Sequence, residues 1–270
     1  MARVSAVDNW RQSLESLALP PELVASAPES PWGFAVSLFD RLADDAMTAQ
    51  TASRRAAATM LADGGAVLDV GCGGGAASLP LVPLARHVVG VDESAAMLEA
   101  FAARADRLGV AHREVAGRWP DVAESAPAVD VAVCHHVLYN VAGLPPFVRA
   151  LTAAASRGVV VELTAAHPLA WMVPLWRRLH GLERPPGPTI DDLLPALGEL
   201  GVQPRVTRWS QPSPWQDAAG DVVAFVRRRL CLPASRDDDV RTALGAEGVP
   251  VTREMVTLAW RAAPRTPTAG

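Results

Sequence analysis

The chain has 270 residues, half of them hydrophobic and a fifth charged, which supports a packed core and argues against wholesale disorder. Its net charge of −4 and pI near 5.9 provide no basic surplus for nucleic acid as the main partner. Three widely spaced cysteines and the lack of an apolar leader lead us to expect no disulfide framework, no metal site and no membrane segment, in a soluble cytoplasmic protein.

The predicted elements begin with helices. Apolar residues recur at helical spacing up to about residue 60, with proline breaks at 20–21 and 28–31, and we predict an N-terminal helical cap over residues 1–60. From residue 61, β-branched runs alternate with Ala- and Leu-rich stretches. This alternation predicts strands at 67–70, 88–91, 112–115, 129–134, 158–163, 202–209 and 255–260. Helices are predicted at 94–108, 145–155, 191–200, 217–230 and 237–244, the first of them capped by Ser94.

Continuous apolar strands that alternate with helices indicate a parallel sheet covered on both faces. We therefore predict an α/β fold, with a doubly wound, seven-stranded, mostly parallel sheet over residues 61–270. The alternation loosens at about 164–190 and 210–250, where we expect insertions. The first insertion contains the Trp- and Met-bearing segment 168–180, which is a candidate apolar lid over a ligand site or, alternatively, ordinary core.

The first predicted strand ends in a glycine-rich turn, G-C-G-G-G at 71–75. Ligands of open α/β sheets bind beyond the carboxyl ends of the strands, and glycines let the backbone turn sharply and approach a ligand closely. Asp92 follows 21 residues after Gly71, at the end of the second strand, where a carboxylate can bind two ribose hydroxyls. This layout is shared by dinucleotide and S-adenosyl cofactors.

Two features distinguish these cofactor classes. Asp69 lies two residues before the first glycine, where its carboxylate can meet a cationic amino-acid group but would repel a pyrophosphate. The helix expected after the turn contains Pro80 and Pro83, which make it a poor helix for facing a phosphate. An S-adenosyl cofactor is therefore favoured, and a dinucleotide-dependent oxidoreductase is the alternative.

The stretches V-L-D-V-G-C-G-G-G at 67–75 and V-V-G-V-D-E-S at 88–94 resemble motifs I and II of the class I S-adenosylmethionine-dependent methyltransferases, of the small-molecule, bacterial type. The resemblance covers about residues 60–165. It implies a Rossmann-like class I methyltransferase fold that binds S-adenosyl-L-methionine and releases S-adenosyl-L-homocysteine. The cofactor-binding residues that it implies are Asp69 beside the turn, the backbone of Gly71, Cys72 and Gly73 at the methionine part, Asp92 at the ribose, and Glu93 and Met97 near the adenine.

The end of the third strand departs from the family pattern. Many members place an aspartate directly after a glycine there, whereas this chain has A-G-R-W-P-D at 116–121. We expect the backbone of Gly117 and Arg118 to replace that acid. Trp119 is expected either to pack on the purine or to fill the core.

A group of polar residues, His135, His136, Tyr139 and Asn140, follows the fourth strand, a position that flanks the methyl group and the acceptor in the family. Neighbours in an extended segment point in opposite directions. We therefore assign His135 to cofactor contact through its backbone, and His136 as the candidate base. Tyr139 is a further catalytic candidate. Two histidines with purely structural roles are the alternative, because methyl transfer needs little beyond proximity and in-line orientation.

Two more candidates accompany the fifth strand. Glu162 ends an apolar strand, where a carboxylate is costly unless it is paired. His167 follows in the next loop and is the second candidate base, or else a loop cap before Pro168. The predicted function is methylation of a small-molecule acceptor at oxygen or nitrogen, with no nucleic-acid or membrane partner; the oligomeric state is left open. The alternatives are an oxidoreductase, an RNA or protein methyltransferase, and a non-catalytic cofactor binder.

Overall fold

The structure, a computed structural model, describes residues 4–32, 36–215 and 219–262. Within these residues seven strands form one sheet in the order β3-β2-β1-β4-β5-β7-β6. The strands are β1 Gly65–Val70, β2 Ala85–Asp92, β3 Ala111–Ala116, β4 Val129–His135, β5 Ala155–Thr164, β6 Arg205–Pro212 and β7 Thr252–Arg261. Strands β1 to β5 run parallel, and β7 is antiparallel to both β5 and β6. The predicted seven-stranded, mostly parallel sheet is confirmed.

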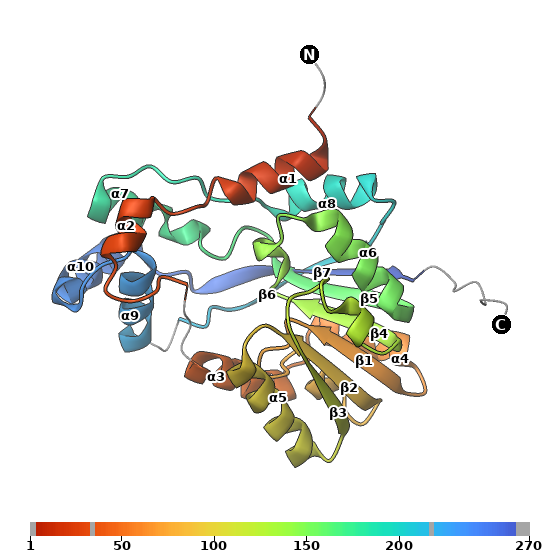
Figure 1. Ribbon diagram of the computed structural model, residues 1–270. Coiled ribbons are helices and arrows are strands. Elements are labelled where there is room, and N and C mark those ends of the chain that lie inside the picture. Colours follow the sequence, from red (N-terminus) through yellow and green to blue (C-terminus); the bar gives the residue numbers. More distant parts are fainter. Residues whose placement is uncertain (1–3, 33–35, 216–218, 263–270) are drawn as a thin grey trace.

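Helices cover both faces of this sheet (Figure 1). One face packs against α1 (Ala6–Glu15), α6 (Leu144–Ala154) and α8 (Ile190–Glu199), and the other against α4 (Ala52–Leu61) and α5 (Ala95–Leu108). Side chains alternate between the faces along each strand, so that Leu68 and Val70 of β1 enter the first core while Val67 enters the second. The doubly wound arrangement follows from this alternation.

The predicted cap of α5 is present in the structure. The Ser94 hydroxyl accepts a hydrogen bond from the Met97 amide, and the helix ends at Gly109, whose φ of +64° is the left-handed conformation that favours glycine. In contrast, the helix expected after the glycine turn does not form in the described residues. A single 3-10 turn, Leu79–Leu81, stands there, since Pro80 lacks an amide hydrogen and Pro83 follows closely.

A separate core lies beyond the carboxyl ends of the strands, among helices that we call the helical lobe (left in Figure 1). The lobe consists of α2 (Pro21–Ser26), α7 (Val173–His180), α9 (Ala219–Arg229) and α10 (Asp237–Glu247). Buried Leu175, Val226 and Val240 join its three larger helices. Helix α7 falls within the first predicted insertion, and α9 and α10 within the second.

The helices of residues 1–60 do not lie together (Figure 1). Helix α1 packs on α8, α2 joins the helical lobe, and α3 (Val36–Thr48) contacts α5. Helix α4 packs directly on β4, β5 and β7 and buries Ala57 and Leu61 in the sheet's second core. A domain boundary near residue 60 stays a prediction, but α4 contributes to the core that supports β1.

Candidate cofactor and acceptor site

A cavity of about 1840 Å³ opens at the carboxyl ends of β1, β2, β4 and β5 and continues under the helical lobe. Pockets for one small ligand usually measure about 300–1,000 Å³, so this cavity has room for two molecules side by side. We call the part around residues 69–97 the glycine-turn half. The part between β4, β5, β7 and the lobe is called the lobe half.

The glycine turn is fixed by its backbone. Gly71 and Gly73 have φ values of +71° and +49°, and a Cβ on Gly71 would lie 2.4 Å from a methyl carbon of Val137. The amides of Gly71 and Cys72 both donate to the Val91 carbonyl, at 2.8 and 3.0 Å, and so tie the turn to β2. The Cys72 thiol is buried, and burial raises its pKa. Cys72 therefore presents its backbone atoms to the cavity, and not a reactive thiolate.

Asp69 lies under this turn and is 1% exposed. Its Oδ2 accepts a hydrogen bond of 2.7 Å from the Ser78 hydroxyl, while Oδ1 has no partner in the described residues. Burial raises the pKa of Asp69 to about 7; the Ser78 hydrogen bond opposes that rise and the charge of Asp92 adds to it. A buried carboxylate oxygen without a donor is costly, so Asp69 is suited to a cationic ligand group.

The Asp92 carboxylate accepts two backbone hydrogen bonds and also lines the cavity. Its Oδ2 accepts from the Gly73 amide at 3.0 Å and its Oδ1 from the Ser94 amide at 2.9 Å, which joins the glycine turn to the start of α5. Each carboxylate oxygen retains further acceptor capacity, and the residue lines the cavity together with Met97. Asp92 therefore both stabilises the glycine turn and faces the space for a ligand.

The other residues expected near an adenine lie differently. Glu93 and Arg118 form an exposed ion pair of 3.4 Å, and neither lines the cavity. The Gly117 amide donates to the Asp92 carbonyl at 2.9 Å. Trp119 is buried in the core, where its Nε1 donates to the Phe147 carbonyl at 3.3 Å. Of the two roles considered for Trp119, the structure shows the core role.

In the lobe half, polar residues form a row across the sheet. His135, Glu162 and Thr257 stand opposite one another on β4, β5 and β7, and the Ser53 hydroxyl of α4 lies 2.7 Å from that of Thr257. Burial lowers the pKa of His135. Burial would raise the pKa of Glu162, but the two histidines beside it and the Ser53 hydroxyl keep it below its usual range. Burial therefore favours the neutral form of His135, whereas the surroundings of Glu162 favour its ionised form.

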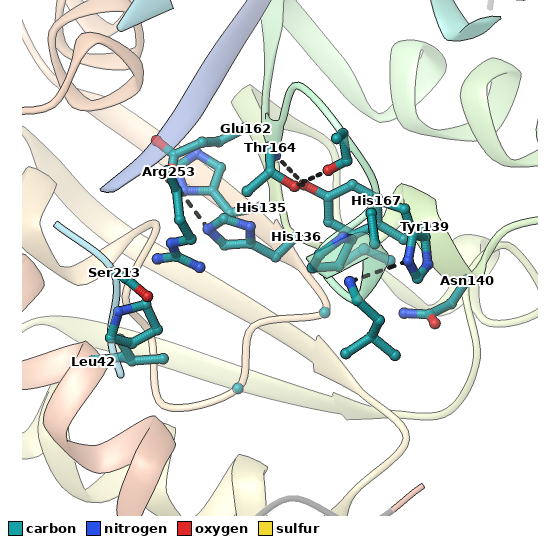
Figure 2. A pocket seen from close by; sticks show the side chains of 18 of the residues that line it. Leu42, His135, His136, Tyr139, Asn140, Glu162, Thr164, His167, Ser213 and Arg253 are labelled. Carbon is teal, nitrogen blue, oxygen red and sulfur yellow. Dashed lines mark hydrogen bonds and ion pairs between the residues drawn. The ribbon is translucent and has the colours of Figure 1, made fainter. Parts of the chain in front are cut away.

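His136 is turned back over this row. Its φ of +60° is unusual for a residue with a side chain, and its amide donates to the Glu162 carbonyl at 2.8 Å. Its Nε2 lies 3.3 Å from Glu162 Oε1, and the side chain is 41% exposed towards the cavity (Figure 2). The carboxylate expected to need a partner is thus paired, and it positions the imidazole.

Tyr139 and His167 lie beside His136 but are more constrained (Figure 2). The Tyr139 hydroxyl forms a hydrogen bond of 2.8 Å with the Thr164 hydroxyl and accepts another from the Thr164 amide. Burial raises the pKa of Tyr139. His167 Nδ1 accepts from the Leu169 amide at 3.2 Å. Burial and the nearby charge of Arg229 lower the pKa of His167 to about 4. His167 has the geometry of the loop cap that was the alternative to a base.

Some residues of the site carried no sequence signal. Ser78 follows the glycine turn without any pattern that links it to Asp69, and the Ser53–Thr257 contact joins segments 204 residues apart. Arg253 lines the cavity from the start of β7, where nothing in the sequence distinguishes it from other strand residues. The described residues contain no group of three or more His, Cys, Asp or Glu side chains placed to bind a metal ion. Nor is any described helix both long and apolar enough to cross a membrane.

Comparisons with known proteins agree with this geometry. A family model described as a methyltransferase domain matches residues 67–158, from the glycine turn into β5. The ubiquinone biosynthesis O-methyltransferase of Azorhizobium caulinodans is 33% identical over 83 residues, which are 31% of this chain and 33% of that protein. The chain therefore spans about a third of the length of the curated relative it matches.

Two solved structures share the fold. The YcgJ protein of Bacillus subtilis aligns with a TM-score of 0.53 at 18% identity, over 79% of this chain and 98% of that one. The magnesium protoporphyrin IX methyltransferase of Synechocystis, solved with bound S-adenosylhomocysteine, aligns with a TM-score of 0.50 at 17% identity, over 84% and 90%. Strand order and glycine turn define the class I methyltransferase fold. Residues 67–158 thus match a methyltransferase domain on a class I methyltransferase fold, and the resemblance carried by residues 67–94 is confirmed.

Proposed function

We propose that the protein transfers a methyl group from S-adenosyl-L-methionine to a small-molecule acceptor, at an oxygen or a nitrogen atom. The observation that carries this proposal is Oδ1 of buried Asp69, which has no hydrogen-bond partner in the described residues. Asp69 lines the cavity together with the glycine turn and Asp92. A ligand that carries an ammonium group and a ribose fits these two acids. A dinucleotide would bring its pyrophosphate towards Asp69 instead.

The residues of the glycine-turn half would hold the cofactor in defined parts. Asp69 and the backbone at residues 71–73 would hold its amino-acid end, Asp92 its ribose, and Met97 the adenine side. When bound, the cofactor supplies an electrophilic methyl group on a sulfonium. The chain's own task is then to place the acceptor in line with that methyl group and to exclude water, which the helical lobe is placed to do.

His136 is the residue best placed to accept a proton from the acceptor. The Glu162 carboxylate lies 3.3 Å from Nε2, and a carboxylate that accepts from Nε2 leaves Nδ1 as the acceptor in the uncharged tautomer of histidine. A hydroxyl or amine in the lobe half can release its proton to that atom as it becomes nucleophilic. His167, with its pKa near 4, is a weak base by comparison.

Isothermal titration of the full chain with S-adenosylhomocysteine and, separately, with NADH tests the cofactor part of the proposal. We expect binding of S-adenosylhomocysteine alone; binding of NADH alone would contradict the proposal. Incubation with methyl-labelled cofactor and a whole-cell extract, afterwards separated into metabolites, RNA and protein, tests the transfer, and label should enter small molecules. Label found only in RNA or protein would assign a macromolecular acceptor. No label anywhere, despite cofactor binding, would make the protein a non-catalytic binder.

A further inference from the structure

Arg253 enters the lobe half at a distinctive place. It is the second residue of β7, lies opposite Gln211 of β6, and precedes Met255, which pairs with the last residue of β5. Because side chains alternate along a strand, Arg253 leaves the sheet on the face that carries Thr257. Figure 2 shows its guanidinium end pointing into the cavity, between Ser213 and His136.

Among the described residues, the guanidinium has no protein acceptor. Its Nε is buried without a hydrogen-bond partner, and no hydrogen bond or ion pair of the side chain is found in the described parts of the chain. Burial lowers the pKa of Arg253, against the attraction of Tyr139 and Glu162. A half-buried cation with five donor hydrogens and no acceptor is a costly arrangement.

Two other arginines that line the cavity donate hydrogen bonds to backbone carbonyls. Arg54 donates to the Met47 and Ala49 carbonyls at 3.1 and 3.0 Å, and Arg184 donates to the Ala18 carbonyl at 2.8 Å. These side chains brace loops around the opening, and their donors are used. Arg253 differs from them because its donors remain available to a ligand.

The acidic residues near Arg253 are also engaged. Glu162 attracts the guanidinium but is paired with His136 and forms no ion pair with Arg253. Glu254, the next residue of β7, pairs with Arg208 at 3.0 Å. The positive charge of Arg253 is therefore balanced only at a distance, which leaves a subsite for one anionic group beside His136.

Apolar and aromatic side chains form much of the rest of the lobe half, beside polar residues such as Gln211, Ser213 and Arg229. Its walls include Leu169, Trp171, Trp176, Trp215 and Phe225, and Trp215 stacks on Phe225 with ring centroids 4.4 Å apart. Such walls favour an apolar, ring-sized body. An available guanidinium beside these walls suits a molecule with an apolar body and a planar anionic group.

We propose that the methyl acceptor is an apolar, aromatic-type carboxylate whose carboxylate is bound by Arg253 while its nucleophilic atom lies beside His136. This inference rests on the proposed methyl transfer. It names the acceptor's class and a residue that determines specificity. The two parallel donors of a guanidinium match carboxylate and phosphate alike. A carboxylate is chosen because its single charge is balanced by the one charge of Arg253, whereas a phosphate monoester carries about −1.5 to −2 charges at pH 7.

Ligand binding to the full chain saturated with S-adenosylhomocysteine tests the role of Arg253. The probes are benzoate, naphthoate and decanoate, each compared with its neutral amide, and the eight tryptophans report binding by fluorescence. We expect the wild type to bind at least one carboxylate at least about tenfold more tightly than its amide. Arg253→Gln should abolish this preference and leave amide binding unchanged, and Arg253→Lys should keep part of it.

Arg261→Gln is the matched control, because Arg261 is an exposed arginine at the other end of the same strand. It should behave like the wild type. Equal binding of every carboxylate and its amide by the wild type, or an undiminished preference in Arg253→Gln, would overturn the role of Arg253. If Arg253→Gln does not fold, as judged by circular dichroism, the wild-type preference and its reduction in Arg253→Lys decide the question.

The same titrations separate this inference from the proposed function. Binding of S-adenosylhomocysteine is measured first, and its absence would contradict the methyltransferase proposal itself. Normal cofactor binding without any preference for carboxylates would overturn the subsite alone.

Discussion

The glycine-turn half of the cavity comes from one continuous stretch, residues 69–97, whereas the lobe half combines β4, β5, β7 and helices distant in the sequence. In the first half, Asp69 and Asp92 are fixed by hydrogen bonds to residues at most 19 positions away. In the second, Glu162 pairs with His136 and lies on the strand beside that of Arg253 only because the strands assemble in a particular order. One half is a local motif, and the other is a product of topology.

This difference in construction corresponds to a difference in chemistry. The glycine-turn half presents two carboxylates and backbone amides, which suit a cofactor common to a whole family. The lobe half presents an imidazole, a guanidinium and aromatic walls, which suit one acceptor. If the two halves act separately, substitutions in one should leave the ligand of the other unaffected.

The largest effect is expected for Asp69, as a dependence of stability on pH. The pKa of Asp69 is raised from 3.8 to about 7 in the folded state, so the folded protein retains a proton that the unfolded chain has lost between these values. The free energy of unfolding should therefore fall as pH rises from about 4 to 7, by up to roughly 4 kcal/mol. Denaturant unfolding of the cofactor-free protein at several pH values measures this fall.

Asp69→Asn removes the titrating group but retains the shape of the side chain. The variant should gain stability relative to the wild type as pH rises through that window. A constant difference between the two proteins from pH 4 to pH 8 would show that Asp69 ionises freely in the fold. Saturating S-adenosylhomocysteine should reduce the wild-type fall, because a bound ammonium group stabilises the ionised carboxylate.

The second effect concerns His136 in the lobe half. His136→Asn is the appropriate change, because asparagine tolerates the positive φ of +60° found there. We expect the turnover of the methyl acceptor found in the cell extract to fall about hundredfold, as for the loss of a general base. The affinity for S-adenosylhomocysteine should be unchanged. His167→Asn is the comparison variant. A larger loss of turnover in His167→Asn than in His136→Asn would transfer the base role to His167.

The strand, the turn and the acid of the glycine-turn half could be located from the sequence, and the reason is physical. Strand, turn and acid lie within one βαβ unit, so their contacts are fixed by spacing along the chain. The prediction of a helix after the turn was wrong, because Pro80 lies there and only a 3-10 turn forms. The two roles of Trp119 also stayed undecided, because its burial depends on contact with Phe147 of α6.

The lobe half was predicted in outline only. His136 and His167 were identified because they follow strands, but spacing could not reveal that Glu162 positions the former and that burial lowers the pKa of the latter. Arg253 escaped notice, because its meaning depends on β7 being inserted antiparallel beside β5. Such strand pairings are long-range and leave no periodic signal in the sequence.

The third effect concerns Asp92 in the glycine-turn half. Asp92→Ala removes the acceptor of the Gly73 and Ser94 amides and the carboxylate that would bind the ribose. Hydrogen bonds to a charged group contribute about 1.5–3 kcal/mol, so the affinity for S-adenosylhomocysteine should weaken at least about tenfold. Calorimetry measures this loss. Unchanged affinity would contradict the ribose role, and carboxylate binding to the lobe half should persist in any case.

The smallest effect is expected one residue further on. Glu93 is 66% exposed at its side chain, pairs with Arg118 at the surface and does not line the cavity. Exposed ion pairs contribute about 0–1 kcal/mol, so Glu93→Ala should leave both the free energy of unfolding and the affinity for S-adenosylhomocysteine nearly unchanged. The same titration that detects the loss in Asp92→Ala checks this. A comparable loss in Glu93→Ala would mean that the cofactor extends beyond the cavity along the start of α5. The glycine-turn half would then extend further along α5 than the cavity lining indicates.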